Sequence, residues 1–487
     1  MASPQDMPPR KDLMLTYDLS KRGKTPTYLY LYQCIRDDIM SGVIAPEEKI
    51  PSKRALATHL GTSVITVENA YNLLLVEGYV RSRERVGFFA EDLGTRAQVR
   101  HRRQRVIALG ADEHVYFADF SSNKVQTALY PSSSMAKLTR EMLSLNDSNL
   151  LRTVPFNGIP LVRHAISEHL ARYRGMDVDP DQIIVGSGIE YLYSRLMQLF
   201  DERTVLGLED PGNHKFSRIA ARNRIRSEFI PIDSDGVQLD RLAQSGVSLM
   251  HVSPANSFPL GSVMPIRRRL DLLSWLDQDS SRYLIEDDFD SELNSYGNPT
   301  TPIFAADPGE RTIYLNSFSK TLVPSLRISY MVLPPALIER YLATMTFYSC
   351  TVSGSDQYVL ARFIQEGYFE RHLNHLNTVF KHERAQVVHE MHETGLDELG
   401  SVFVPPAGTH VIVRLGDMGA TRAQLKRRAE KLDIRFAFVA DYASEPTEEM
   451  HRELVVNYAS VPPERLREGL LRLKDCIAPK SGGSAHT

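Results

Sequence analysis

The feature that most constrains the fold is a regular alternation of short apolar segments and amphipathic helical segments between residues 116 and 478. The apolar runs in DQIIVGSG, TVLGLEDPG, SLMHVSPAN, RYLIEDD and RTIYLNS each end in polar residues or glycine. Strands that alternate with helices predict an α/β fold, a mostly parallel sheet with helices on both faces. Ligands of such sheets bind beyond the carboxyl ends of the strands, so we expect a site there.

Chain length indicates more than one domain. The 487 residues exceed the roughly 250–300 that one hydrophobic core supports. We expect a small helix-rich domain at 20–92, an Arg-rich linker at 93–115, and a large domain at 116–478. Within the large domain we expect a large subdomain at about 150–340 and a small α+β subdomain at about 341–478.

Composition excludes several classes of protein. No run of about 18 apolar residues occurs, and the N-terminus lacks the apolar stretch of a signal peptide, so we expect a cytoplasmic protein without membrane contact. Cys34, Cys350 and Cys476 lie far apart, which argues against a cysteine zinc site, and we expect no metal. The arginine run between Gly94 and Gly110 is typical of a solvated linker and only sometimes of an arm that contacts phosphates.

The small domain has the pattern of a helix-turn-helix followed by a hairpin. Apolar residues repeat at helical spacing in the first helix, at Tyr28, Leu31, Tyr32, Ile35 and Ile39. A second helix follows a cap at Ser52 and ends at Gly61, and a third begins after Thr62 or Ser63. The third helix is predicted to bury Val67, Ala70, Tyr71 and Leu74. VRSRERVGFFA then predicts a hairpin, the wing of the domain.

The side chains left outside this unit predict contact with double-stranded DNA. Ser63, Thr66 and Asn69 lie at the exposed start of the third helix, which enters the major groove in this motif. Ser52, Lys53 and Arg54 begin the second helix, where a backbone phosphate can bind. Arg81, Arg83 and Arg85 lie along the wing. The alternative is a small helical packing unit with solvated charges.

Residues 26–90 resemble the GntR-type winged helix. The family pattern, roughly L-P-S-x-R-x-L-A…L-G-x-S-x-x-T-V…A-Y…L…E-G, appears here as IPSKRALATHLGTSVITVENAYNLLLVEGYV. Many members carry arginine directly after the turn serine, where this chain has Val64. We therefore expect no bidentate contact with guanine at that position.

A second group of residues predicts a cofactor site. In SFSKTLVPSLRISYMVLP, Lys320 follows a predicted strand and a Ser-Phe-Ser turn, and such a lysine can form a Schiff base with an aldehyde cofactor. Asp287 ends an earlier predicted strand and can keep a pyridine nitrogen protonated. Gly188, Ile189 and Glu190 offer backbone N–H groups to a phosphate at a helix N-terminus. Taken singly, these are also compatible with a surface lysine, capping acids and an ordinary glycine turn.

The large domain resembles the class I aminotransferase fold, and residues 26–475 resemble the MocR-type, or GabR-like, regulators. The resemblance lies in PFNGIPLVRHAISEHLARYRGMDVDPDQIIVGSG, LEDPG, SPANSFPLGSVMP, LIEDDFDSE, NSFSKTLVPSLRISYMVLP and GYFERHLNHL. It implies pyridoxal 5'-phosphate bound to Lys320 as the catalytic lysine, Asp287 as the partner of the pyridine nitrogen, and Ser317, Ser319 and Arg327 as phosphate ligands. The expected cofactor-binding set also includes Gly188, Ile189, Glu190, Asn213, Phe258 and Phe289. A head-to-tail homodimer is implied as well.

Several positions depart from the family pattern. Asn213 stands where a tyrosine usually stacks on the cofactor, Ile189 replaces a hydroxylic phosphate ligand, and Phe289 replaces a tyrosine. Val455 matches the arginine that binds the substrate carboxylate in aminotransferases, with Arg452 three residues earlier. The missing arginine removes a contact worth about 1.5–3 kcal/mol, which disfavours ordinary transamination of an α-amino acid.

Together these features predict a ligand-responsive transcription regulator. An amine, an amino acid or a cofactor vitamer would alter the linkage at Lys320 or the closure of the large domain, and so reposition the DNA-binding heads. Two alternatives remain open: an active aminotransferase with an autoregulatory DNA-binding head, and a regulator whose pocket no longer holds the cofactor. The sequence does not indicate the effector, the operator, the target genes, or activation as against repression.

Overall fold

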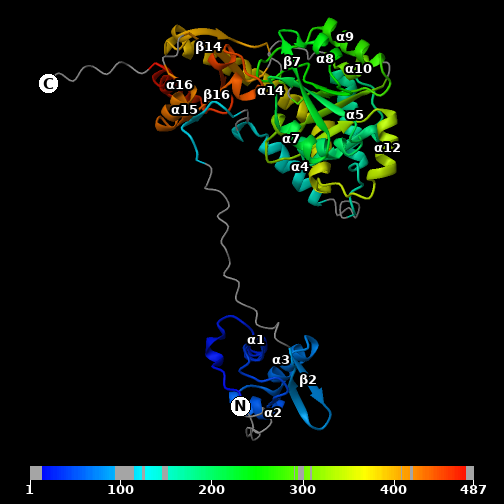
Figure 1. Ribbon diagram of the computed structural model, residues 1–487, viewed down its shortest axis with the longest axis vertical. Helices are drawn as coiled ribbons and strands as arrows, with labels where there is room; N and C mark the ends of the chain where they lie inside the picture. Colours follow the sequence, from blue (N-terminus) through cyan, green and yellow to red (C-terminus); the bar gives the residue numbers. More distant parts are fainter. Residues whose placement is uncertain are drawn as a thin grey trace, which may run out of the picture. The chain divides into compact units, whose positions relative to one another are not determined.

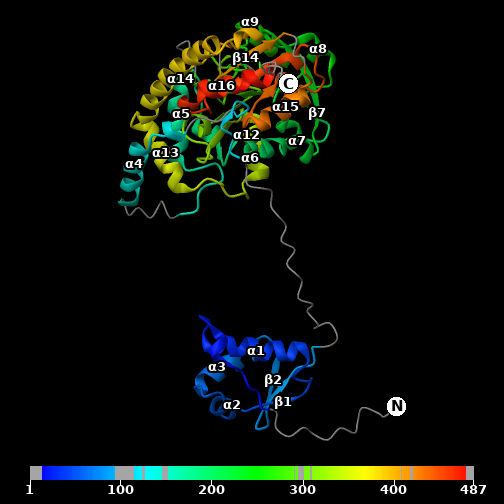
Figure 2. The same cartoon turned by 90° about the vertical axis from the view of Figure 1, so that its left-hand side faces the viewer.

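The computed structural model forms two compact units, Met1–Glu113 and His114–Thr487 (Figures 1 and 2). It describes residues 14–93, 114–122, 127–144, 152–289, 291–293, 301–307, 310–406, 408–416 and 420–478. The arginine run of the expected linker lies outside the described residues. Among the described helices, none combines the length and the apolar composition needed to cross a membrane.

The N-terminal unit is a winged helix. Its elements are α1 (Thr27–Ser41), β1 (Lys49–Ile50), α2 (Lys53–Leu60), α3 (Val64–Val76), β2 (Val80–Arg83) and β3 (Gly87–Ala90). Helices α2 and α3 meet at Gly61, whose φ of 61° suits glycine, and β2 and β3 form the antiparallel wing. The predicted stripe of α3 is buried, but Tyr28 is 37% exposed. Tyr28 lies in the first turn of α1, one turn before the first buried residue of the helix.

The second unit contains an eight-stranded sheet in the order β5-β12-β11-β10-β9-β6-β7-β8. Its strands are β5 (Ile183–Gly186), β6 (Val205–Asp210), β7 (Arg226–Asp233), β8 (Gly236–Val237), β9 (Leu249–Val252), β10 (Tyr283–Asp287), β11 (Thr312–Ser317) and β12 (Ser329–Val332). Strands β11, β10, β9, β6 and β7 are parallel, whereas β12 is antiparallel to both of its neighbours. The prediction of a mostly parallel sheet is confirmed.

Helices cover both faces of this sheet, as the alternation of side chains along the strands requires. Helices α4 (Ser132–Ser144), α5 (Pro160–Arg174) and α13 (Gly354–Gln365) pack on one face, together with Tyr314. Helices α6 (Ile189–Met197), α7 (Lys215–Arg222) and α12 (Pro335–Met345) pack on the other, together with Ile313 and Leu315. Helices α8 (Leu239–Gln244) and α9 (Ile266–Asp277) complete the covering near β8. Neighbouring residues of β11 therefore enter opposite cores.

A four-stranded antiparallel sheet forms the C-terminal part, in the order β13-β14-β17-β16. Its strands are β13 (Gly400–Phe403), β14 (His410–Leu415), β16 (Ala437–Phe438) and β17 (Glu453–Asn457), with α14 (Tyr368–Glu393), α15 (Arg422–Lys431) and α16 (Pro463–Ile477) around a separate core. Strand β4 (Ala118–Asp119) joins this part by pairing with β15 (Ile434–Arg435). The small subdomain was expected to begin at about residue 341. Helix α13 comes after that point in the chain but packs against α4 and α5 of the large subdomain.

Candidate functional site

A cavity of about 470 Å³ lies at the carboxyl ends of the strands of the large sheet. All eleven residues of the expected cofactor-binding set line it: Gly188, Ile189, Glu190, Asn213, Phe258, Asp287, Phe289, Ser317, Ser319, Lys320 and Arg327. They converge because the loops that follow parallel strands leave a sheet at the same edge. The cavity is large enough for a cofactor-sized ligand.

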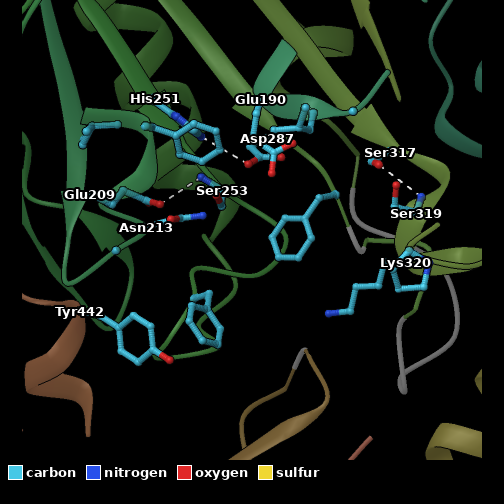
Figure 3. A pocket seen from close by; sticks show the side chains of 18 of the residues that line it. Glu190, Glu209, Asn213, His251, Ser253, Asp287, Ser317, Ser319, Lys320 and Tyr442 are labelled. Atoms are coloured by element: carbon cyan, nitrogen blue, oxygen red, sulfur yellow. Dashed lines mark hydrogen bonds and ion pairs between the residues drawn. The ribbon is translucent and has the colours of Figure 1, made fainter. Parts of the chain in front are cut away.

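Asp287 is a buried carboxylate at the inner end of the cavity (Figure 3). Its Oδ2 atom lies 3.5 Å from Nε2 of His251, and His251 Nδ1 shares a 3.1 Å hydrogen bond with the hydroxyl of Tyr193. Oδ1 of Asp287 is buried and has no hydrogen-bond partner among the described residues. A buried acceptor without a partner is costly, so this oxygen is suited to a donor on a bound ligand.

Lys320 reaches the same cavity from the short helix α11 (Phe318–Thr321), which directly follows β11. The residue is buried, and Nζ lies 5.1 Å from the centroid of the Phe289 ring. The preceding serines form the turn that holds the helix: Ser317 Oγ accepts a hydrogen bond from the Ser319 amide at 3.2 Å and another from Ser329 Oγ at 2.8 Å. These hydrogen bonds hold the turn between β11 and α11, the helix that carries the lysine.

The start of α6 lies beside Arg327, and the backbone N–H of Gly188, expected there for a phosphate, instead donates to the Gly186 carbonyl at 2.9 Å. Gly188, with φ 96°, lies against the guanidinium of Arg327, and a Cβ on Gly188 would be 2.3 Å from Nη2. Only glycine permits this approach of backbone and arginine. The side chain of Glu190 is bound here already: it lies 2.6 Å from Nη2 of Arg327 and 2.9 Å from Nζ of Lys215. Burial alone would raise the pKa of Glu190, but bonds from Lys215, its own backbone and Arg327 lower the pKa to about 2.

The opposite wall of the cavity contains residues that the sequence did not indicate. Glu209 is buried in β6, and its Oε2 accepts a hydrogen bond from the Ser253 amide at 3.1 Å, whereas Oε1 has no partner among the described residues. Burial, together with the charge of Asp287, raises the pKa of Glu209 to about 8. Tyr442 comes from the C-terminal part, and its carbonyl accepts a hydrogen bond from the Gly212 amide at 2.8 Å.

Nine further residues line the cavity that were not predicted from the sequence: Ser121, Leu208, Glu209, Gly212, Phe216, His251, Ser253, Pro324 and Tyr442. The segment SLMHVSPAN could have indicated His251, because a histidine inside an apolar strand is buried and needs a polar partner. That partner is Asp287, on the neighbouring strand. Tyr442 had no such signal, since it lies far away in the chain.

Val455 takes no part in the cavity wall. It is buried in β17, paired with Ile412 and Ala437, and Arg452 is exposed in the turn before the strand. Among the described residues that line the cavity, Lys320 and Arg327 are the ones with lysine or arginine side chains. No guanidinium from β17 faces the part of the cavity near Asn213 and Tyr442.

In the winged helix, hydroxyl groups cap both helices of the motif. Ser52 Oγ accepts a hydrogen bond from the Ala55 amide at 3.2 Å, and Ser63 Oγ accepts one from the Thr66 amide at 3.1 Å. Of the two helix starts offered for α3, the cap is therefore Ser63. Asn69 is exposed on the same helix.

The expected DNA-contacting cations differ in their surroundings. Lys53 lies 2.7 Å from Glu68, and both Arg81 and Arg83 form ion pairs with Glu47. Arg54 and Arg85 are exposed, and neither forms an ion pair with another described residue. These two are the cations most available to a phosphate backbone.

Comparison with known proteins identifies relatives for both units. Residues 27–90 match the family model described as bacterial regulatory proteins, gntR family, and residues 117–472 match aminotransferase class I and II. The chain is 32% identical to the "Uncharacterized HTH-type transcriptional regulator YdeL" of Bacillus subtilis (strain 168), over 94% of this chain and 98% of the relative. It is 28% identical to the "Probable rhizopine catabolism regulatory protein MocR" of Rhizobium meliloti, over 96% and 97% of the two chains.

Among solved structures, the kynurenine aminotransferase of Pyrococcus horikoshii superimposes with a TM-score of 0.65. The match is 21% identical and covers 78% of this chain and 97% of that one. At this identity the likeness concerns the fold. The predicted combination of a winged helix with an aminotransferase-like α/β unit is confirmed.

Proposed function

The chain belongs to the transcriptional regulators that join a gntR-family head to an aminotransferase class I and II domain, and on this premise we propose that its large unit binds pyridoxal 5'-phosphate and senses an amine, an amino acid or a cofactor vitamer. The observation that carries the proposal is the unpartnered Oδ1 of Asp287, buried in a cavity that Lys320 and Arg327 also line. A pyridinium N–H is a donor that this oxygen lacks.

The residues present fit the cofactor at three points. Asp287, next to His251, would hold the ring nitrogen, Lys320 would receive the aldehyde, and the N-terminus of α6 with Arg327 would bind the phosphate. When bound, pyridoxal phosphate supplies an electron sink for amino compounds. The carboxylate of Asp287 keeps the proton on the ring nitrogen, and the bond from Tyr193 fixes the orientation of His251.

The cavity wall near Asn213 and Tyr442 favours a role in sensing a ligand over catalytic turnover of an amino acid. Productive transamination of an α-amino acid needs a cation for the substrate carboxylate, and the described residues of that wall provide Glu209 instead. An active aminotransferase is the second candidate, favoured by the intact Lys320 and Asp287. A pocket that holds another ligand in place of the cofactor is the third.

We further propose a head-to-tail homodimer in the cytoplasm, with a DNA-binding domain at residues 20–92 and a cofactor and effector domain at 116–478. Double-stranded DNA would bind through the nine positions that the sequence indicated, six of which are exposed and three of which (Lys53, Thr66 and Arg81) are half-buried, with α3 in the major groove. The exposed Arg54 and the cap at Ser63 support this assignment. An effector shifts the heads only if it binds the DNA-competent and DNA-incompetent states with different affinity.

Titration of the purified full chain with pyridoxal phosphate tests the proposal. We expect the visible absorbance of the bound cofactor in the native protein and in Lys426→Ala, whose lysine pairs with Asp441 outside the cavity. Lys320→Ala should lose that absorbance. An identical spectrum in Lys320→Ala would contradict the assignment, and release of products from common amino donors would favour the enzyme.

A further inference from the structure

The first turn of α3 presents aliphatic side chains to solvent. Val64 is 42% exposed and Ile65 is 68% exposed, whereas Val67, directly after the turn, is buried in the core of the head. At such exposure a large part of each side chain lies outside the core of the head. They occupy the part of the helix that meets base edges when α3 lies in a major groove.

The hydroxyl groups of this turn are bonded within the helix. Ser63 Oγ and Thr66 Oγ1 lie 2.8 Å apart, and Ser63 Oγ also accepts the Thr66 amide hydrogen at 3.1 Å. Their hydrogen-bonding capacity is therefore partly used in capping. Val64 and Ile65 are exposed apolar groups of this turn, and no arginine stands at residue 64 to reach guanine.

The surroundings of the turn indicate what covers it. Asn69 lies one turn beyond Ile65 on the same face of α3 and is exposed, and Arg54 is exposed on α2 without an ion pair to a described residue. A surface that combines a cation and an amide with a small aliphatic group is complementary to a DNA groove. In the major groove the apolar group of a base edge is the 5-methyl of thymine.

We propose that Ile65, with Val64 beside it, contacts thymine methyl groups, so that the preferred half-site of this regulator carries thymine at the bases facing the first turn of α3. This inference rests on the proposed placement of α3 in the major groove. It assigns sequence preference to side chains that the expected set of Ser63, Thr66 and Asn69 did not include.

The test removes single methyl groups from the DNA. Duplexes are first selected from a randomised library with the full chain in the presence of pyridoxal phosphate, and each thymine of the preferred half-site is then replaced singly by deoxyuridine. Burial of one methyl group predicts that binding weakens about fourfold at one or two positions and stays unchanged at the others. Ile65→Ala should bind the thymine and uracil duplexes equally well at those positions.

Val76→Ala is the matched control, because Val76 is 84% exposed at the opposite end of the same helix. It should retain the thymine preference of the native chain, and Ile65→Val should retain part of it. Equal affinity for thymine and uracil at every position of the native half-site would overturn the inference while leaving DNA binding intact. The inference would also be overturned if Ile65→Ala changed only the oligomeric state, because the first turn of α3 would then contact another protein chain. Failure to select any duplex would overturn both this inference and the proposed placement of α3.

Discussion

Replacing Glu190 by glutamine should tighten the binding of pyridoxal phosphate. The carboxylate of Glu190 lies 2.6 Å from Arg327, the residue expected to receive the phosphate, so cofactor and side chain compete for one guanidinium. The substitution Glu190→Gln keeps the size of the side chain and one acceptor oxygen, removes the charge, and turns the second acceptor into an NH2 donor. The loss of repulsion between carboxylate and phosphate is the physical reason for the gain.

The magnitude follows from distance and exposure. Two unit charges about 4 Å apart at an effective dielectric constant of about 20 repel by roughly 4 kcal/mol. The Glu190 side chain is 38% exposed and also pairs with Lys215, so solvent and the lysine screen most of this energy. We therefore expect a gain of about 1 kcal/mol, or roughly fivefold tighter binding. Lys215→Met should weaken binding by a similar factor, because it removes the cation that partly neutralises the charge of Glu190 beside Arg327.

Equilibrium titration monitored by cofactor absorbance or protein fluorescence measures the effect. The pKa of Glu190 is about 2 and the phosphate is largely a dianion above about pH 7, so both charges are constant there, and the ratio of affinities should be the same at about pH 7.5 and about pH 8.5. Glu366→Gln is the control, because Glu366 pairs with Arg362 outside the cavity. Unchanged or weaker binding by Glu190→Gln would refute the competition.

Four further outcomes are expected. Asp287→Asn should weaken cofactor binding by about 1.5–3 kcal/mol in the same titration, because it removes a charge-assisted hydrogen bond, and an unaltered affinity would refute its role. Glu209→Gln should raise the free energy of unfolding above about pH 8. Because the pKa of Glu209 is raised from 4.5 to about 8, the unfolded native chain loses this proton first, and its free energy of unfolding declines between pH 4.5 and about 8. Denaturant titrations should show a smaller decline in the variant. Arg174→Met should lower the free energy of unfolding by about 3–5 kcal/mol, since it leaves the buried carboxylate of Asp288 unpaired, and Asp288→Leu in the same chain should restore much of the loss in urea unfolding. Arg54→Ala should weaken DNA binding for all sequences and reduce the salt slope by about one, as measured by binding isotherms at several salt concentrations.

Much of the fold could be predicted because it depends on interactions between residues that are close together in the chain. Caps such as Ser52, the glycine turn at Gly61 and the buried stripe of α3 depend on residues within one or two helical turns. The polar ends of the strands placed Asp287 and Lys320 at one edge of the sheet, since parallel strands end together. Periodicity indicates a face of a helix and not how far the neighbouring elements cover it, and Tyr28 on that face of α1 is 37% exposed.

By itself, then, the sequence determined the winged helix, the parallel sheet and the convergence of the expected residues on one cavity, because backbone preference and side-chain period act locally. Only the tertiary structure decided that Glu190 forms an ion pair with Arg327, that His251 contacts Asp287, and that Tyr442 of the C-terminal part lines the cavity. These pairings join segments far apart in the chain. Which charges meet is set by how whole layers pack, and no local pattern of residues records that choice.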